Sequence, residues 1–337
     1  MSPSNNNNKN ELPRLGFLGL GWIGLNRMQA MLAENACQVA AIADPSAEMR
    51  ERAAQAAPGA VALSSLDELL LQDLDGVVIA TPSALHAQQS LAALWRGLAV
   101  FCQKPLARTA GENQAIIDAA RQADRLLGCD LSYRHTEAMR RIRNAVVEGE
   151  LGSVYAVDLL FHNAYGPDKS WARDPALAGG GCAIDLGIHL VDLALWTLGF
   201  PEVTNVSSRL YAQGQQLPAG SAQVEDYAVA QFDLANGCVV RMACSWNLPF
   251  GRDAAIEAHF HGTRGGAAMT NVNGSFYDFA AARFQGTQHI PLADPPDAWG
   301  GRAAVDWARR LAGGARYDKS IETLVQVATV LDRVYGR

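Results

Sequence analysis

The sequence predicts an α/β chain in two parts: a doubly wound parallel sheet, followed by an α+β domain with a large, mostly antiparallel open sheet. The first part is indicated by short apolar runs that alternate with helical stretches between residues 13 and 132, as parallel strands joined by right-handed crossovers do. The second part is indicated by consecutive β-like runs with turn signals such as Asn236-Gly237 between them. We therefore place one domain at 13–132 and a second at 133–337.

Strands of the first sheet are expected where apolar runs are nearly continuous, because helices cover both faces of such a sheet. These runs lie at 15–18, 38–43, 76–80, 99–102 and 126–131, and helices are expected between them at 22–34, 47–57, 84–95 and 110–123. In the second part we expect a basic helix ending at 148, strands near 154–161, 227–234, 238–246, 255–261 and 265–270, and a final helix over 321–334.

Composition limits the class of function. Hydrophobic residues make up 49% and charged residues 18% of the 337, which fits a soluble globular protein with two cores. The net charge of -6 is spread without long blocks, so a nucleic-acid partner is not expected. No window approaches the roughly 18 consecutive apolar residues of a membrane span. A small-molecule ligand is the better expectation.

The cysteines and the N-terminus indicate a cytoplasmic protein without a metal. The six cysteines show neither CxxC pairing nor metal-ligand spacing, and their apolar surroundings are typical of reduced, buried thiols. Residues 1–12 are polar, include the asparagine run 5–8 and lack the apolar core of an export signal. We expect these residues to form a disordered lead-in.

A glycine pattern near the N-terminus predicts a cofactor site. Gly19-Leu20-Gly21-Trp22-Ile23-Gly24 matches GxGxxG, follows the strand at 15–18 and opens a helix. Gly19, Gly21 and Gly24, with Trp22 and Ile23, would hold a pyrophosphate at the positive end of that helix. Asp44 lies twenty residues beyond Gly24, at the end of the next strand, where a carboxylate can accept hydrogen bonds from a ribose.

Asp44 also favours NAD over NADP as the cofactor. A carboxylate repels the 2'-phosphate of NADP, and residues 45–47 provide no arginine to neutralise that phosphate. The alternative for the glycines is a purely structural turn, and the alternative for Asp44 is a strand-end turn or a helix cap.

Two further segments follow strands whose carboxyl ends should meet at the ligand-binding edge of the sheet. Thr81-Pro82-Ser83-Ala84-Leu85-His86 follows 76–80, and Gln103-Lys104-Pro105 follows 99–102. The Lys104 ammonium could stabilise negative charge on a substrate oxygen, with a solvated loop charge as the alternative. Thr81 and Pro82 are expected beside the cofactor, and His86 is expected to cap a helix or to pack near the cofactor.

The run Gly179-Gly180-Gly181-Cys182-Ala183-Ile184-Asp185-Leu186-Gly187-Ile188-His189 places an acid and an imidazole four residues apart, behind three glycines. If the chain is helical from Cys182, Asp185 and His189 share one face. An imidazole oriented by a carboxylate can accept a proton near neutral pH, and the glycines would let the backbone approach a ligand closely. The alternative is a favourable acid at a helix N-terminus and a core histidine.

Together the glycine motif, Asp44, the TPSALH segment, the KPL segment and the GGGCAIDLGIH run resemble the glucose-fructose oxidoreductase, inositol dehydrogenase and MocA family over nearly the whole chain. The resemblance implies an N-terminal Rossmann domain and a second domain for substrate binding and oligomerisation, whose open sheet often forms the oligomer interface. It also implies oxidation of a hydroxyl, or the reverse reduction, on a sugar, polyol or related small molecule.

The resemblance also assigns roles to residues. Lys104 matches the active-site lysine of the family, Asp185 the acid of its motif and His189 its usual proton acceptor. Most members carry glutamate where this chain has Gln103, so the hydrogen bonding and protonation of Lys104 are open. The Lys104-Pro105 peptide is expected to be cis, as is common in the family.

The leading hypothesis is a NAD-dependent dehydrogenase in which hydride leaves to the cofactor while His189 takes the hydroxyl proton. Asp185 would orient the imidazole or hold a neighbouring hydroxyl, and Lys104 would stabilise the oxygen. Substrate contacts are expected from Arg134, Asn163, Tyr165, Trp171 and Arg173, with surface or interdomain packing as the alternative. A non-catalytic sensor of NAD or sugar and a keto-sugar reductase are the competing functions. A homodimer or homotetramer is expected.

Overall fold

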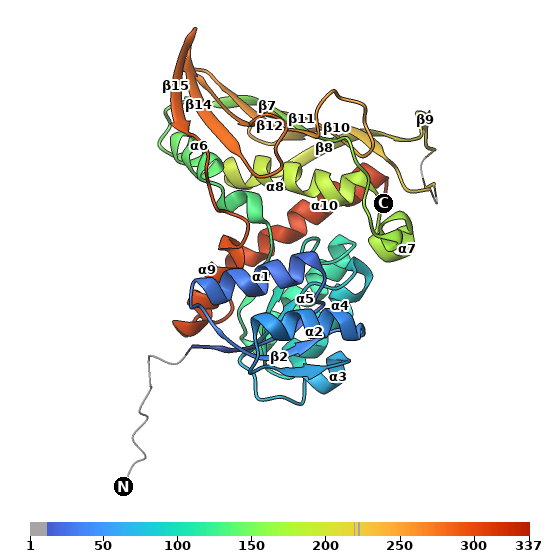
Figure 1. Cartoon of the computed structure of the whole chain (residues 1–337). Coiled ribbons are helices and arrows are strands. Elements are labelled where there is room, and N and C mark those ends of the chain that lie inside the picture. The colour runs from blue at the N-terminus through green and yellow to red at the C-terminus, as the bar shows by residue number, and fades with distance from the viewer. Residues whose placement is uncertain (1–11, 219, 222) are drawn as a thin grey trace.

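The first sheet of the computed structural model is a six-stranded parallel sheet in the order β3-β2-β1-β4-β5-β6. This sheet and its helices form the lower half of Figure 1, below the second sheet. The structure describes residues 12–218, 220–221 and 223–337, so nearly all of the predicted lead-in lies outside the described residues. The strands are β1 (Arg14–Leu18), β2 (Gln38–Ala43), β3 (Val61–Leu63), β4 (Gly76–Ile79), β5 (Ala99–Cys102) and β6 (Leu127–Cys129). The predicted doubly wound fold is confirmed.

Helices cover both faces of this sheet, as its apolar strands require. They are α1 (Trp22–Ala33), α2 (Ala47–Ala56), α3 (Leu66–Leu69), α4 (Ser83–Trp95) and α5 (Ala110–Ala123). Three of them begin at a side-chain cap: Ser46 caps α2, Ser65 caps α3 and Thr109 caps α5. The first sheet therefore follows from local apolar runs and capping residues.

One helix from the end of the chain also packs on this first sheet. In α9 (Arg302–Ala312), Ala304 and Trp307 are buried in the same core as Phe17 and Phe101. Gly128 in β6 makes room for this helix, because a Cβ there would lie 2.7 Å from the Trp307 ring. Residues 302–312 fall within the range 133–337 that was predicted as the second domain, yet this helix packs in the core of the first sheet.

The second sheet has nine strands in the order β15-β14-β13-β12-β7-β11-β10-β8-β9. All neighbours are antiparallel except β7 and β11, and Gly237, with φ of +86°, makes the expected tight turn between β10 and β11. The strands are β7 (Val154–Asn163), β8 (Val203–Ala212), β9 (Gln215–Gln216), β10 (Tyr227–Leu234), β11 (Val239–Ser245), β12 (Ala254–Gly262), β13 (Gly266–Asn271), β14 (Phe279–Gln285) and β15 (Gln288–Ala293).

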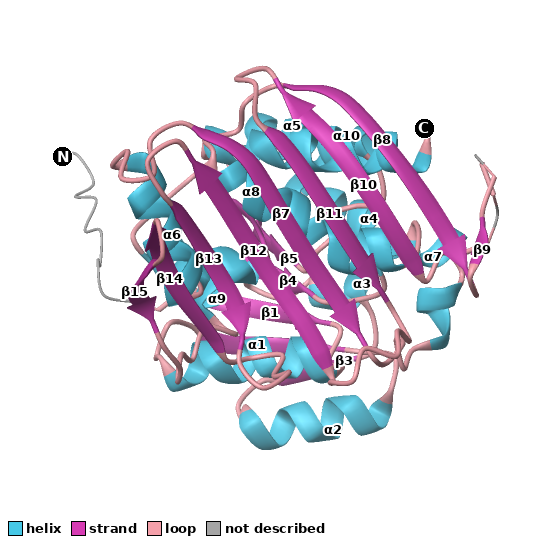
Figure 2. Cartoon of the chain, turned by 90° about the horizontal axis from the view of Figure 1, so that it is seen from above, coloured by secondary structure: helices cyan, strands magenta, loops and turns pink. Residues whose placement is uncertain are grey.

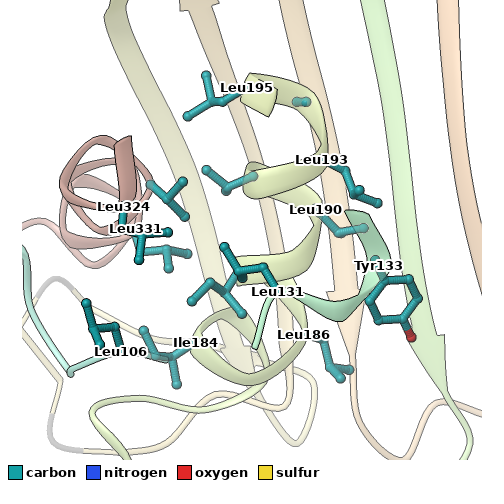
Figure 3. Packing of buried hydrophobic residues seen from close by; sticks show 14 of the residues in the cluster. Leu106, Leu131, Tyr133, Ile184, Leu186, Leu190, Leu193, Leu195, Leu324 and Leu331 are labelled. Carbon is teal, nitrogen blue, oxygen red and sulfur yellow. The ribbon is translucent and has the colours of Figure 1, made fainter. Parts of the chain in front are cut away.

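Helices of the second part lie against one face of this sheet, and the described residues place no helix on the other face (Figure 2). The covering helices are α6 (Glu137–Val147), α8 (Ile188–Thr197) and α10 (Thr323–Tyr335). In Figure 3, Leu190 and Leu193 of α8 lie on the side of Tyr133, and Leu324 and Leu331 of α10 pack from the opposite side. The helical stretch Pro175–Thr197 is apolar and long enough to pass for a membrane span, and 83% of its most apolar 18-residue window is buried inside the fold.

Candidate active site

The glycine motif forms a tight turn between β1 and α1. Gly19 has φ of +86°, and a Cβ there would lie 2.6 Å from the Ala80 carbonyl. A Cβ at Gly24 would collide with the carbonyl oxygen of Gly19. Gly21 differs, because a Cβ there would meet described atoms only at 3.9 Å. Gly21 also starts α1, which has neither a side-chain cap nor an acid in its first turn, so this positive end is left open for a phosphate.

Asp44 lies at the end of β2 beside the glycine turn. Its Oδ2 accepts a hydrogen bond from the Leu20 amide at 2.8 Å, and its Oδ1 accepts one from the Ser46 amide at 2.9 Å. Arg50 was not among the predicted site residues, and its Nη1 donates to the carbonyls of Asp44 at 2.6 Å and Pro45 at 3.0 Å. Arg50 lies one turn into α2, so only its helical position reveals that it reaches back to Asp44.

The segment after β4 is tied to the segment after β5. The buried His86 places Nδ1 at 2.7 Å from the Pro105 carbonyl and Nε2 at 2.8 Å from the Thr81 carbonyl. Burial lowers the pKa of His86, and a neutral imidazole can donate to only one of the two carbonyls. The Thr81 hydroxyl donates to Gln89, and Pro82 precedes α4. His86 thus holds the two strand-end loops together rather than facing open space.

Lys104 and Asp185 form an ion pair between the two domains. The Lys104 ammonium donates to Asp185 Oδ1 at 2.7 Å and to the Asp185 carbonyl at 2.6 Å, and Trp246 Nε1 donates to Asp185 Oδ2 at 3.1 Å. The Asp185 side chain is still 39% exposed, so a ligand can reach the pair. The Lys104-Pro105 peptide is cis, as expected.

Asp185 does not hydrogen-bond His189, contrary to one of the two roles expected for this acid. Ala183–Gly187 forms a single π-helical turn before α8, and the wider turn replaces the α-helical face on which the two side chains were expected to meet. The carboxylate is engaged by Lys104 and Trp246 instead. Its physical role here is to hold the lysine.

His189 is 7% exposed, and its ring lies 4.7 Å from the Tyr133 ring, centroid to centroid. Its Nδ1 has no hydrogen-bond partner among the described residues. Burial, with the positive charges of Lys104 and Arg27, lowers the pKa of His189 well below its usual 6.5. The imidazole is therefore neutral at neutral pH and can accept a proton.

Gln103, which stands where most members of the resembling family carry glutamate, has a direct structural explanation. Its amide nitrogen donates to Asp130 Oδ2 at 2.6 Å, and its side-chain oxygen accepts from the Lys104 amide at 3.1 Å. Asp130 is buried and also receives a hydrogen bond from Arg27 Nε at 2.6 Å. A glutamate at this position would face a second carboxylate. Arg27 and Asp130 were not predicted as part of the site. The one sign of their role is that each is a charged residue at a buried position.

The three glycines before the π-turn approach other groups of the protein closely. A Cβ at Gly180 would collide with the Tyr335 hydroxyl, and a Cβ at Gly181 with the Glu225 carbonyl. The buried Glu225 carboxylate accepts hydrogen bonds from the Gly181 amide and from the Ala183 amide at 2.9 Å. The glycine run therefore clamps the start of the π-turn that carries Asp185.

The residues expected to contact the substrate fall into two groups. Arg134 makes a bidentate pair with the buried Asp192 of α8 and lies over the Phe200 ring. It therefore supports α8 and is not part of the hydrogen-bonded group of Lys104, Asp185 and Trp246. The others lie at or after the end of β7. Asn163 accepts from the Tyr165 amide at 2.8 Å, the Tyr165 hydroxyl donates to Asp253, and the half-buried Trp171 and exposed Arg173 belong to the short helix η2 (Ser170–Arg173).

Comparison with known proteins shows which protein family shares this arrangement. Residues 14–131 match the model of the oxidoreductase family with an NAD-binding Rossmann fold, and residues 139–268 match the GFO/IDH/MocA C-terminal domain. Inositol 2-dehydrogenase of Leifsonia xyli subsp. xyli is 28% identical over 82% of this chain and 78% of its own length. D-glucoside 3-dehydrogenase of Escherichia coli K12 is 29% identical over 60% of each chain, so the match spans less than two thirds of that protein.

Solved structures share the fold. Levoglucosan dehydrogenase in complex with NADH and L-sorbose superposes with a TM-score of 0.82 at 24% identity, covering 96% of both chains. Among the solved structures of this fold, some hold NADH and others NADP. With the two family models covering most of the chain in the order of its two sheets, the chain belongs to the GFO/IDH/MocA family of oxidoreductases, whose first domain is an NAD-binding Rossmann fold.

Proposed function

We propose that this protein is a NAD-dependent dehydrogenase that transfers a hydride between the nicotinamide and a hydroxyl-bearing carbon of a sugar, polyol or related small molecule. The observation that carries the proposal is the Lys104–Asp185 ion pair, in which the lysine follows the Rossmann strand β5 and the acid lies in the turn that leads into α8, the helix of the buried His189. Ligands of open α/β sheets bind at the carboxyl ends of the strands. The sugar and polyol dehydrogenases among the relatives support the substrate class.

The residues divide the chemistry of alcohol oxidation between them. The bound cofactor supplies the carbon that takes the hydride from the substrate C–H bond. His189 accepts the hydroxyl proton, because burial keeps its imidazole neutral before the reaction. Lys104, held by Asp185, donates a hydrogen bond to the same oxygen and stabilises the charge that develops there. In the reverse direction His189 returns the proton.

The preference for NAD is supported by Asp44, whose carboxylate lies beside the glycine turn. Arg50 works against that preference, because its guanidinium at the Asp44 carbonyl could approach a 2'-phosphate. We give the carboxylate the larger weight because its two oxygens are fixed by backbone amides at the ribose end of β2.

The test is NADH formation at 340 nm across a panel of sugars, inositols and sugar glycosides, with NAD and NADP in parallel. We expect turnover on at least one member, with kcat/KM higher for NAD. Asp44→Ser should shift the ratio toward NADP, because it removes the negative charge and leaves Arg50 in place. Cofactor binding without turnover on any substrate would favour a sensor, and a clear NADP preference of the unaltered chain would contradict the role of Asp44.

We also propose a cytoplasmic homodimer or homotetramer. The uncovered face of the nine-stranded sheet supports assembly: Val229, Ala243 and Leu160 form a row of paired apolar residues across β10, β11 and β7 on that face. Six free cysteines support a reducing compartment. Light scattering of the purified chain measures the assembly, and a monomer at micromolar concentration would contradict it.

A further inference from the structure

Lys169 brings a positive charge from the second domain to the cofactor turn of the first. Its Nζ lies 3.9 Å from the position that a Cβ at Gly21 would occupy. Lys169 belongs to the segment between β7 and α7 (Pro175–Ala178), and its side chain is exposed. Across residues 12–218, 220–221 and 223–337 it forms no salt bridge and no side-chain hydrogen bond, although acidic residues pair with most of the arginines.

The place it occupies is already positive. The N-terminus of α1 carries the partial positive charge of the helix, its first turn has no acid, and Gly21 supplies no side-chain cap. An ammonium beside such a terminus is repelled by it, and an anion between the two relieves that repulsion. The Gly19–Gly24 turn is built to accept a pyrophosphate at this point, because a backbone without Cβ at Gly21 leaves the space open.

We propose that Lys169 binds the pyrophosphate of the dinucleotide, so that the second domain completes the cofactor site of the first. The anion lies between the amides at the start of α1 and the Lys169 ammonium, and each neutralises one side of it. Because Trp171 and Arg173 follow on the same segment, in η2, a bound cofactor also fixes the segment that borders the substrate site. This inference rests on the cofactor site of the proposed function and adds a residue to it.

The test uses ADP-ribose, which contains the pyrophosphate but lacks the nicotinamide, so that binding is measured without turnover. Isothermal titration would compare the unaltered chain with Lys169→Met, which keeps the apolar stem without the charge, and Lys169→Arg, which keeps the charge. Lys319→Met, another exposed lysine in η4 (Lys319–Glu322), is the matched control. Thermal unfolding of each variant checks that the chain remains folded.

We expect Lys169→Met to weaken ADP-ribose binding about tenfold, the loss of one charge-assisted hydrogen bond. Lys169→Arg and Lys319→Met should bind within about threefold of the unaltered chain, and the deficit of Lys169→Met should shrink in 0.5 M salt because ions screen the charge. Equal binding by Lys169→Met, or an equal loss in Lys169→Arg, would overturn the proposal while leaving the cofactor site intact. Failure of the unaltered chain to bind ADP-ribose would overturn both the cofactor site and the role of Lys169.

Discussion

At the residue scale, Gln103 and Asp130 show how a glutamine in place of a glutamate is accommodated. The negative charge lies on Asp130, to which the glutamine amide donates. The buried Asp130 carboxylate receives hydrogen bonds from both Arg27 and the Gln103 amide. The Gln103 oxygen in turn accepts from the backbone of Lys104, the residue that holds Asp185. Next to Lys104, the negative charge therefore lies on Asp130 and not on the residue that precedes the lysine.

This arrangement predicts that Gln103→Glu destabilises the protein by about 1–3 kcal/mol, because a second carboxylate would replace a hydrogen-bond donor to Asp130. Urea unfolding measures the loss. Adding Asp130→Asn to that variant should recover part of it, since the asparagine amide can donate to the introduced carboxylate. If the double variant is as unstable as the sum of the two single variants, the proposed coupling is wrong.

At the element scale, the start of α8 depends on its contacts with α10 and with Glu225, which precedes β10. Tyr335, near the end of α10, accepts hydrogen bonds from the Gly181 amide at 3.2 Å and the Ile184 amide at 3.1 Å, and donates to Glu225 at 2.7 Å. Burial raises the pKa of Glu225 above its usual value. The π-turn that presents Asp185 to Lys104 is thus clamped by groups far away in the sequence.

Gly180→Ala tests this clamp. The new Cβ would meet the Tyr335 hydroxyl, so the glycine run must shift and the free energy of unfolding should fall by about 1–3 kcal/mol. The catalytic rate should fall with it, because Asp185 moves relative to Lys104. Gly59→Ala is the control, since a Cβ there has no atom within 4 Å. Wild-type stability and rate in Gly180→Ala would show that the run is not constrained.

Local patterns could predict the elements but not all of their contacts. The bounds of β2, β5, α5 and β10 match the expected ranges, because apolar runs and caps are local signals. The glycine run was interpreted as a site of close ligand approach, since its true partners, Tyr335 and Glu225, are more than forty residues away. Arg134 was expected to contact the substrate because nearby residues gave no sign of its true partner, Asp192, which lies on another element.

At the scale of the whole molecule, the chain crosses between its two sheets more than once. After the nine-stranded sheet it returns through α9 to pack Trp307 on the first sheet, and then α10 packs on α8 of the second (Figure 1). No sequence pattern near α9 indicates this return, because an amphipathic helix does not specify which apolar surface it covers. Gly76 and Gly128 are local signs of this contact, because a Cβ at either would crowd the Trp307 ring, but they can be interpreted only once Trp307 is in place.

Several histidines buried in this fold predict that stability falls in mild acid. Burial lowers the pKa of His86, His162 and His189, and lowers that of His135 to about 4. Below pH 6.5 the unfolded chain binds protons at these residues while the folded chain does not, so the free energy of unfolding decreases as the pH falls. Each histidine that stays neutral contributes a slope of about 1.4 kcal/mol per pH unit.

Thermal unfolding between pH 7.5 and 5 measures this effect. We expect the midpoint to fall steadily below pH 6.5, and the fall to be smaller in His135→Asn. An unfolding midpoint that stays constant from pH 7.5 to 5 would contradict the burial of these imidazoles.

The central claim is that His189 takes the proton while Lys104, held by Asp185, stabilises the oxygen. The most direct measurement is hydride transfer by His189→Ala in a single turnover, on the best substrate of the panel, together with the affinity of the variant for NAD. We expect transfer to slow by at least ~100-fold, the usual contribution of a general base, with NAD bound within about twofold of the unaltered chain. An unchanged rate of hydride transfer would show that His189 is not the proton acceptor.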